Sequence, residues 1–562
     1  MTPFSRRAFL RAGAGIAAGA ALPGWPLAGL SARPPLDLLL RGGRVVDGTG
    51  RPAFRADVGV RDDRIVSVGS LPDAAAATVL DVTGHVVSPG FVDVHGHTDL
   101  GIFIDPHADS KVRQGVTTEV VGQDGSSVMP VTDAMRERRL ERYRERYDVE
   151  IDPADWTELF AALAATGHLA NFATMVGSGT VREVVVGETD RAPSDGELQR
   201  MVRLVEEARD AGVVGVSSGL EYTPNAYAET AELVALSGPF AGTGLPYASH
   251  LRDEADRVEE ALAEGIEVAR RAGVAFQASH LKAQGQRNWP KADRLLAAIE
   301  RAAEDGPPAR FDRYPYTAYS TGLSSLFPDR AKDGGTAAFL DRLRNPALES
   351  ELRAAVEEKI AMMGEWDAIQ IASVEGDAPE SVVGRRLGSW SEETGRDPYE
   401  ATVEILLASE NHASIVGHGM SEENTRRFVV HPLGAICSDA GARRSVGPLS
   451  EGTPHPRAYG SFPRVLGRYV REEGALSLEE AVRKMSSLPA TIVGLSNRGT
   501  VAEGKVADLV VFDPARVIDR ATFTAPHRYP EGIPHVVVNG ALAVRDGEPT
   551  GALAGRVVTP TG

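Results

Sequence analysis

The middle of the chain alternates short apolar runs with amphipathic segments, and this alternation constrains the fold more than any other feature. The runs include "GVTTEVVG", "AGVVGVSSG", "LPYASH", "VAFQASH" and "GAICSDAG", with helical patterns such as "DGELQRMVRLVEEARDAG" and "DEADRVEEALAEGIEVARRAG" between them. Strand–helix units repeated over about 350 residues are typical of a parallel α/β fold. We therefore predict a (β/α)8 barrel, whose chemistry lies at the C-terminal ends of its strands.

The two ends of the chain follow a different pattern. Residues 36–88 and the C-terminal segments "ADLVVFDP" and "IPHVVVNGALAVRDG" read as short strands separated by turns, with Asn539-Gly540 as a hairpin turn. We predict one small β-sandwich domain built from residues 33–88 and 499–562, flanking a barrel over 89–498. Residues 326–411 interrupt the barrel rhythm and are expected to form an inserted subdomain, either a substrate-facing lid or a passive decoration.

Four histidines stand at the ends of predicted barrel strands. His95 and His97 close "FVDVHGHTDL", and residues two apart on a strand share a face. The tripeptide Ala-Ser-His recurs thirty residues apart and ends at His250 and His280, a spacing of about one βα unit. Each histidine alone could be structural, but all four are expected at one rim of the barrel.

Two carboxylates follow the same rule. Asp124 ends "TTEVVGQDG" and Asp439 ends "GAICSDAG". Histidines and carboxylates gathered at strand ends form a metal-ligand set. The alternative for Asp124 is a cap of the following segment, and for Asp439 a turn residue.

The motifs "SPGFVDVHGHTD", "SHLRDE", "SHLKAQGQRNW", "CSDAG" and "HPRAYGSFPRVLGRYVRE" together carry a family resemblance. They resemble the N-acyl-D-amino-acid deacylases (D-aminoacylases) of the amidohydrolase superfamily, and the similarity extends over nearly all of the chain after its first 32 residues. A bare His-x-His is weakly specific, whereas the "HPRAYGSFPRVLGRYV" block is highly specific.

The resemblance implies a zinc-dependent amide hydrolase with one or two Zn(II) ions per chain. By position, His250 and His280 would hold the tighter zinc, and His95 and His97 would line a second, weaker position. Asp439 would be the general acid/base. Zinc lowers the pKa of bound water to about 7, and a carboxylate can move the proton to the leaving nitrogen.

One position departs from the family pattern. Asp124 stands where the resembling enzymes carry a cysteine, and Gln123 stands where they carry asparagine. A carboxylate is a harder ligand than a thiolate and has two oxygens that can bridge two ions. We therefore expect a more evenly occupied pair of metals, bridged by Asp124.

Substrate contacts are also implied by the resemblance. Positions matching Lys282, Arg457 and Tyr222 are expected to meet the carboxylate of an N-acyl amino acid. Arginine can do so with two parallel hydrogen bonds. The alternatives are a surface cation for Lys282, a loop salt bridge for Arg457 and ordinary packing for Tyr222. D-selectivity is inherited from the resemblance alone.

Charge and cysteine content limit the possible partners. The 562 residues carry a formal net charge of -18, which argues against nucleic acid and anionic membrane as general partners. The single cysteine, Cys437, excludes an internal disulfide and any four-thiolate metal site.

The N-terminal segment predicts export. Ser5-Arg6-Arg7-Ala8-Phe9-Leu10 opens a mild apolar stretch and is similar to a twin-arginine signal, with residues 1–32 as the signal peptide. The alternative is an uncleaved anchor, but Pro23 and Pro26 interrupt the stretch and disfavour stable membrane insertion. We expect the twin-arginine export machinery as a partner and a periplasmic or extracellular enzyme.

Other functions fit the sequence less well than metal-dependent amide hydrolysis. Gly215-Val216-Ser217-Ser218-Gly219 matches the serine-hydrolase pattern, but no helical segment follows it. A Cys437 nucleophile is disfavoured by the neighbouring Asp439. A cyclic-amide hydrolase such as a hydantoinase typically uses a carboxylated lysine, and no lysine ends "VVGVSSG" or "TTEVVG". A metal-free binding barrel, the remaining alternative, should have lost its ligand set.

Overall fold

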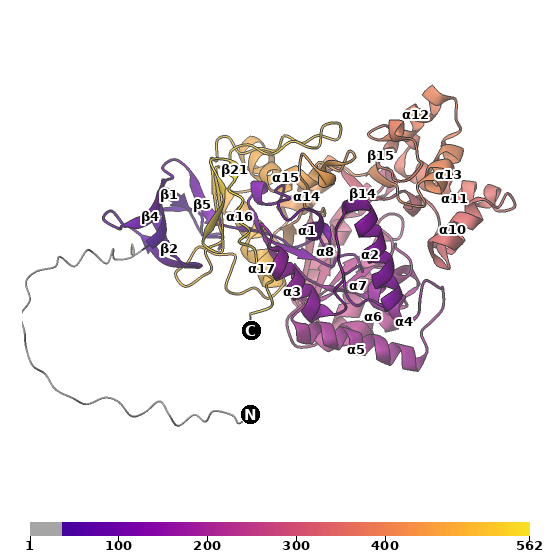
Figure 1. The fold of residues 1–562 in the computed structure, drawn as a ribbon, viewed down its shortest axis with the longest axis horizontal. Helices are drawn as coiled ribbons and strands as arrows, with labels where there is room; N and C mark the ends of the chain where they lie inside the picture. The colour runs from indigo at the N-terminus through magenta and orange to yellow at the C-terminus, as the bar shows by residue number, and fades with distance from the viewer. Residues whose placement is uncertain (1–35, 562) are drawn as a thin grey trace, which may run out of the picture.

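The computed structural model describes residues 36–561. The predicted signal peptide, residues 1–32, lies outside this range. Within it, a β domain, a barrel and an inserted subdomain follow one another in space (Figure 1). Among the described residues, no helix combines the length and the apolar character needed to cross a bilayer.

The β domain joins the two ends of the chain in one nine-stranded sheet. Its N-terminal strands are β1 (Leu36–Val45), β2 (Phe54–Arg61), β3 (Arg64–Gly69), β4 (Ala76–Asp81) and β5 (Val86–Pro89); its C-terminal strands are β18 (Leu509–Phe512), β19 (His535–Val538), β20 (Ala541–Arg545) and β21 (Glu548–Pro549). The two sets meet where β5 pairs antiparallel with β18. Asn539 and Gly540 both have positive φ, 48° and 82°, as the predicted hairpin turn between β19 and β20 requires.

The barrel consists of parallel strands in two ladders. The first is β6 (Phe91–Asp93), β7 (Val116–Val121) and β8 (Asn171–Thr174); the second runs from β9 (Val176–Gly177) through β10 (Val216–Gly219), β11 (Pro246–His250), β12 (Ala275–Ala278) and β13 (Ala309–Arg313) to β17 (Gly434–Ile436). Only Met175 separates β8 from β9. At the other junction, the Asp439 N–H donates to the His95 carbonyl at 2.9 Å, which brings the last strand beside the first.

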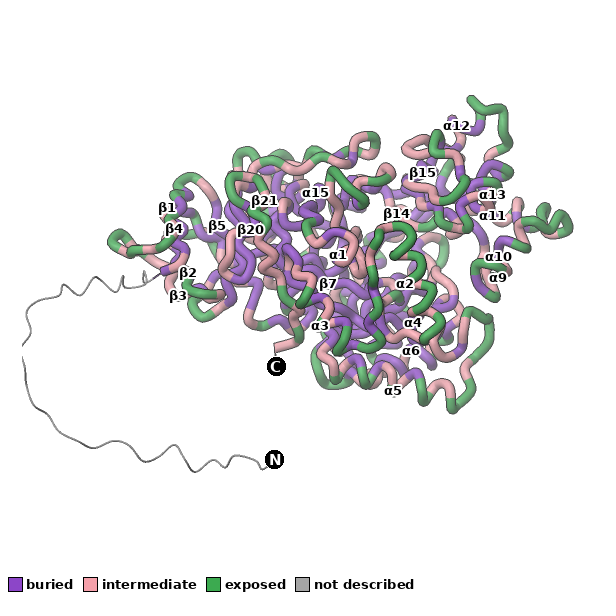
Figure 2. Tube along the Cα trace, in the orientation of Figure 1, coloured by how far each residue is buried: buried purple, intermediate pink, exposed green. Residues whose placement is uncertain are grey.

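The barrel strands are buried and the helices cover them. All six residues of β7 are buried, and buried segments fill the centre of the molecule (Figure 2). The main covering helices are α3 (Trp156–Thr166), α4 (Ser178–Val185), α5 (Asp195–Ala211), α6 (Thr230–Ser237), α7 (Val258–Ala272), α8 (Ala292–Asp305), α14 (Glu422–Val430) and α16 (Leu478–Met485). The predicted barrel class, with a β domain and an insertion, is confirmed by this architecture together with the structural relatives given below.

Helix α5 forms where its sequence predicts, but α7 begins later than its pattern suggests. Ser194 and Glu197 make a capping box at the start of α5, and Gly212 ends it in the left-handed conformation. In the segment before α7, Asp253 Oδ1 instead accepts the N–H groups of Ala255 and Arg257, at 2.7 and 3.1 Å. This local turn competes with helix formation. The residues between β11 and Val258 therefore stay outside the helix and remain at the rim of the barrel.

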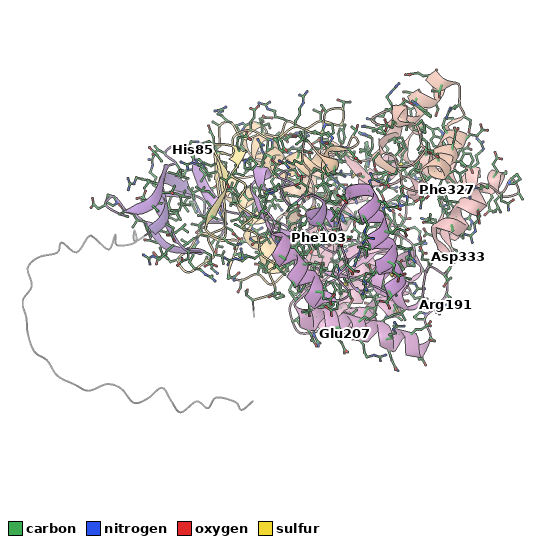
Figure 3. The ribbon with its side chains drawn as sticks, viewed as in Figure 1. His85, Phe103, Arg191, Glu207, Phe327 and Asp333 are labelled. Carbon is green, nitrogen blue, oxygen red and sulfur yellow. The ribbon has the colours of Figure 1, made fainter. Side chains whose placement is uncertain are left out.

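The inserted subdomain has its own antiparallel sheet and core. Its strands are β14 (Ala318–Gly322), β15 (Ile369–Ser373) and β16 (Ser414–His418), and its helices are α9 (Asp329–Lys332), α10 (Gly335–Leu343), α11 (Glu349–Met363), α12 (Leu387–Thr394) and α13 (Pro398–Ala408). It also contacts the barrel through the Asp190 N–H, which donates to Asp333 Oδ1 at 2.8 Å. Figure 3 labels Asp333 and Arg191, the residue after Asp190.

A glycine allows the subdomain to approach the barrel closely. Gly285, in the segment after β12, has φ +83°, and a Cβ there would overlap the Met362 thioether at the end of α11. The Gly285 N–H donates to the Gly419 carbonyl at 2.8 Å, and the Trp289 indole donates to the same residue at 3.1 Å. Helix α11 is therefore fixed against the C-terminal rim of the barrel.

Candidate metal centre

All six residues of the predicted ligand set lie at the C-terminal ends of barrel strands. His250 is the last residue of β11, and the others follow β6, β7, β12 and β17 by two to four residues: His95, His97, Asp124, His280 and Asp439. Three of them have left-handed backbones, with φ of 53° at Asp124, 36° at His280 and 51° at Asp439. Such conformations cost energy outside glycine and cluster at functional sites.

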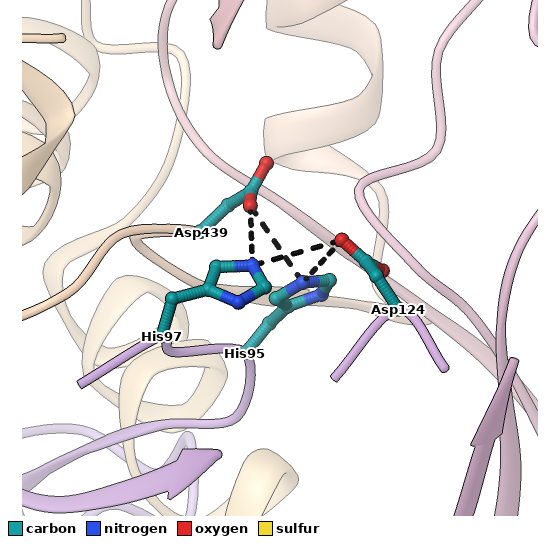
Figure 4. A group of neighbouring side chains, drawn as sticks. All are labelled: His95, His97, Asp124 and Asp439. Carbon is teal, nitrogen blue, oxygen red and sulfur yellow. Dashed lines mark hydrogen bonds and ion pairs between the residues drawn. The ribbon is translucent and has the colours of Figure 1, made fainter. Parts of the chain in front are cut away.

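One oxygen of Asp124 lies among the four histidines. Asp124 Oδ2 is 3.3 Å from His280 Nε2 and 3.4 Å from His95 Nε2. It is 3.6 Å from His97 Nε2 and 3.9 Å from His250 Nδ1. Figure 4 shows the half of this cluster formed with His95 and His97.

These atoms form two potential ligand groups that share Asp124. One contains His95, His97, Asp124 and Asp439; the other contains Asp124, His250 and His280. Ligand atoms about 2.0–2.1 Å from one tetrahedral zinc lie about 3.4 Å apart, which matches the observed separations. The shared carboxylate occupies the position expected of a bridge between the two sides.

Buried polar atoms in this cluster lack hydrogen-bond partners among the described residues. They are His95 Nδ1, His95 Nε2, Asp124 Oδ1 and His250 Nε2. An unpaired buried donor or acceptor is costly. Of these atoms, His95 Nε2 faces Asp124 Oδ2 and Asp439 Oδ1, at 3.4 and 3.6 Å, and an unpaired imidazole nitrogen between two carboxylates fits a bound cation. The donor set, imidazole with carboxylate, suits zinc as well as other transition metals. The residues present therefore fit the predicted metal.

Carboxylates that were not predicted from the sequence lie behind three of the ligand histidines. Asp312 Oδ1 is 3.3 Å from His95 Nδ1, and Glu254 Oε1 is 3.1 Å from His280 Nδ1. Glu221 Oε2 is 3.7 Å from His250 Nε2. Such outer carboxylates orient metal-binding imidazoles and raise their basicity. Two signals were present in the sequence: Asp312 lies at the end of a strand, in β13, and Glu254 belongs to the "SHLRDE" motif.

Asp439 divides its two oxygens between the histidines and Arg457. Oδ1 is 3.1 Å from His97 Nε2 and 3.6 Å from His95 Nε2, while Oδ2 accepts a hydrogen bond from Arg457 at 2.6 Å. Burial disfavours the charged carboxylate, but the Arg457 guanidinium overcomes it and the pKa of Asp439 is held well below its usual range. Asp439 is therefore ionised and faces the metal position.

The three predicted substrate-binding residues line the same cavity, of about 460 Å³. The Arg457 Nε is buried and has no hydrogen-bond partner among the described residues. The Tyr222 ring lies 4.7 Å from the His250 ring, centroid to centroid. Lys282 is already paired, because its Nζ donates to both Glu254 oxygens at 2.6 Å. Its contact with a substrate carboxylate stays a prediction.

The two rejected nucleophiles have structural roles. Ser217 is fully buried, and its hydroxyl donates to the Gly122 carbonyl at 2.6 Å. Cys437 is also buried, and burial followed by nearby carboxylates raises the pKa of its thiol well above the usual value. A thiol held neutral in this way is a poor nucleophile.

Comparison with known proteins decides the family. The chain is 37% identical over 528 residues to the D-aminoacylase of Alcaligenes xylosoxydans xylosoxydans, an alignment that covers 94% of this chain and 98% of the relative. The chain belongs to the N-acyl-D-amino-acid deacylase family of amidohydrolases. This result confirms the family that the sequence predicted. It also confirms the prediction that the protein is a metal-dependent amidohydrolase. The model of the amidohydrolase family also matches residues 447–544.

Solved structures agree with this family assignment. The N-acyl-D-glutamate deacylase of Bordetella bronchiseptica, in complex with zinc and a phosphonate that mimics the tetrahedral intermediate, superimposes with a TM-score of 0.77 at 34% identity, covering 93% of this chain and 99% of that one. A D-aminoacylase described as having a binuclear metal centre gives 0.78 at 35% identity, covering 93% and 100%. A D-hydantoinase, at 14% identity and a TM-score of 0.53, shows the shared fold alone.

Proposed function

We propose that this protein is a zinc-dependent deacylase that removes the acyl group from N-acyl-D-amino acids by hydrolysing the linear amide bond. The observation that carries the proposal is the position of Asp124 Oδ2, within 3.3–3.9 Å of one nitrogen from each of His95, His97, His250 and His280. Family membership supplies the reaction class and the substrate class.

The ligand groups indicate how zinc would be held. His250, His280 and Asp124 would hold one ion, and His95, His97 and the same Asp124 a second. When bound, zinc lowers the pKa of a coordinated water to about 7 and polarises the scissile carbonyl.

Asp439 is positioned to move the proton. Its ionised carboxylate takes a proton from the attacking water as the new C–O bond forms, and returns it to the amide nitrogen as the C–N bond breaks. Arg457 holds Oδ2, so Oδ1 stays directed toward His97 and the reacting atoms. The proton therefore stays on one side of the cavity throughout the reaction.

The Arg457 guanidinium, which lines the cavity, would bind the substrate carboxylate. A guanidinium binds a carboxylate with directed hydrogen bonds, and the Tyr222 hydroxyl lies on the same cavity wall. In this arrangement Arg457 contacts both the base and the substrate, which fixes the amide bond relative to Asp439.

A hydrolysis panel tests this function. Zinc-loaded enzyme is assayed with N-acetyl-D- and N-acetyl-L-amino acids and with hydantoins, and chelated enzyme and His280→Ala serve as controls. We expect turnover of the D-series only, and loss of both zinc and activity in the controls. Turnover of hydantoins without turnover of linear amides would assign the cyclic-amide reaction instead. Full metal content in an inactive wild-type enzyme would favour a binding protein.

We also propose that the protein is exported, folded and with its metal, through the twin-arginine machinery to the periplasm or the exterior. Support comes from Arg6 and Arg7 ahead of a mild apolar stretch. Export of a folded chain is consistent with a metal centre assembled from five strand ends, since such a centre exists only after folding.

A further inference from the structure

The metal-centre cavity adjoins a second cavity beneath the inserted subdomain. The first has a volume of about 460 Å³ and the second about 370 Å³. They share four lining residues, Glu221, Gln284, Ser325 and Lys359. The second continues along the subdomain to Phe327, which Figure 3 labels. A substrate at the metal centre can therefore extend a group toward the subdomain.

Nearly every lysine and arginine that lines these two cavities is paired with a carboxylate. The pairs are Lys282–Glu254, Arg457–Asp439, Arg252–Glu264, Arg287–Asp256, Arg330–Glu351 and Lys332–Asp329. Lys359 is the exception, because no carboxylate oxygen among the described residues lies within 4.0 Å of its Nζ. A half-buried cation without a partner in a ligand cavity is a candidate for binding an anion.

The structure holds Lys359 at the junction of the two cavities. Val356 and Ile360, on the same helix α11, are buried in the core of the subdomain. The Tyr319 hydroxyl lies 3.0 Å from the Met363 sulfur at the end of the helix. With α11 fixed at both points, the Lys359 side chain remains directed to the cavity wall.

Glu221, which lines both cavities with Lys359, is engaged by other groups. Glu221 Oε1 accepts the Glu254 N–H at 3.1 Å, and its Oε2 faces His250. Glu221 therefore lies beside the metal-binding histidine His250, and its carboxylate oxygens are more than 4.0 Å from Lys359 Nζ.

We propose that Lys359 binds a second carboxylate carried by the substrate, while Arg457 binds the carboxylate of the amino acid. This inference rests on the proposed deacylase function. The preferred substrates are N-acyl-D-amino acids with an additional anionic group, either on an acidic side chain such as glutamate or on a dicarboxylic acyl group. Both sources present the same chemistry to Lys359.

A smaller cavity that is also lined by Asp439 is the alternative binding position for the second carboxylate. It has a volume of about 180 Å³ and is lined by Arg443 as well as His97 and Asp439. Arg443 also lacks a carboxylate within 4.0 Å among the described residues. If the second carboxylate bound there, Arg443 rather than Lys359 would determine the preference.

The test compares kcat/KM for matched substrates of the zinc-loaded enzyme. N-acetyl-D-glutamate is compared with its neutral isostere N-acetyl-D-glutamine, and N-succinyl-D-leucine with N-acetyl-D-leucine. For Lys359→Met we expect a fall of about 10- to 100-fold for one acidic member, the size of a lost charged hydrogen bond, and less than threefold for its neutral partner. The substrate pair whose acidic member loses kcat/KM identifies whether the amino-acid side chain or the acyl group carries the anion that Lys359 binds.

Three variants serve as controls. Lys359→Arg keeps the charge and should retain most of the preference. Lys332→Met removes a paired lysine from the same wall and should change nothing. Equal losses for acidic and neutral substrates in Lys359→Met, or a selective loss in Arg443→Met, would overturn the inference and leave the deacylase function intact. Absence of turnover for every N-acyl-D-amino acid would refute the deacylase function and this inference together.

Discussion

Arg457 donates to Asp439 Oδ2 at 2.6 Å, and both side chains are buried. This contact leaves Oδ1 of Asp439 facing His97, and the Arg457 guanidinium also lines the metal-centre cavity. In the proposed function the pair links substrate binding to the position of the base, so a change in either residue should affect turnover more than folding.

Replacement of Asp439 by asparagine should abolish most activity. Asp439→Asn keeps the size and the hydrogen-bond acceptor but cannot take up a proton, so we expect a fall in kcat of about 10²- to 10⁴-fold. Zinc on the His250 and His280 side should remain, as measured by metal analysis. A fall of less than tenfold would mean that another group moves the proton.

Asp124 should determine how many ions bind. Asp124→Ala removes the oxygen shared by both ligand groups, and we expect metal and activity to fall together. Asp124→Cys should restore one tight zinc, because a thiolate is the softer ligand. Metal per chain and kcat are measured for both variants. Full metal and activity in the alanine variant would show that Asp124 is structural.

Asp312 should act through His95. Its Oδ1 lies 3.3 Å from His95 Nδ1 and accepts a hydrogen bond from the His280 N–H at 2.8 Å. Its Oδ2 accepts a hydrogen bond from the Gln277 side-chain amide. Asp312→Asn should weaken metal binding or activity by about 10- to 100-fold, the usual effect of removing such a partner. A zinc titration with a competing chelator measures it. Unchanged affinity and kcat would limit Asp312 to a role in strand packing.

The predicted twin-arginine signal can be tested by locating the protein in cells. Arg6→Lys combined with Arg7→Lys conserves charge but removes the paired arginines, so the protein should stay in the cytoplasm as active enzyme. Fractionation followed by an activity assay locates it. Export of the double variant at the normal level would refute the prediction.

Lys484 should make stability depend on pH. Burial lowers its pKa to about 7, with Arg483 acting in the same direction and Glu480 against it. The unfolded value is about 10.4, so between about pH 7 and 10.4 the unfolded chain binds more protons and stability rises with pH, by up to about 1.4 kcal/mol per unit. Below about pH 7 Lys484 is charged in the folded protein as well, so the full cost of burying this charge lowers the stability.

Replacing this lysine separates its contribution from other titrations. Within residues 36–561, Lys484 Nζ donates only to backbone carbonyls, those of His431 and Gly434, so Lys484→Met loses these bonds at every pH. The difference in Tm, variant minus wild type, should be larger at pH 7 than at pH 9. An equal difference at both would show that Lys484 keeps its charge throughout this range.

Local sequence pattern predicted the barrel and its ligand set, because both depend on short-range regularities. The recurrent Ala-Ser-His fixes His250 and His280 at equivalent strand ends, and parallel strands bring such ends to one rim. The boundary errors were also local: the helix expected to begin before residue 258 is delayed by the turn at Asp253, whose competing hydrogen bonds the apolar periodicity does not reveal.

Tertiary structure alone decided which charges are paired. The sequence marks Lys282 and Arg457 as cations near the site, but only the fold shows Lys282 engaged by Glu254 and Arg457 shared with Asp439. It also brings Lys359, about eighty residues beyond His280, to the cavity by packing α11 against the rim. Pairing depends on how loops from different parts of the sequence pack against one another. The periodicity of the chain does not determine the distance between side chains that meet only after folding.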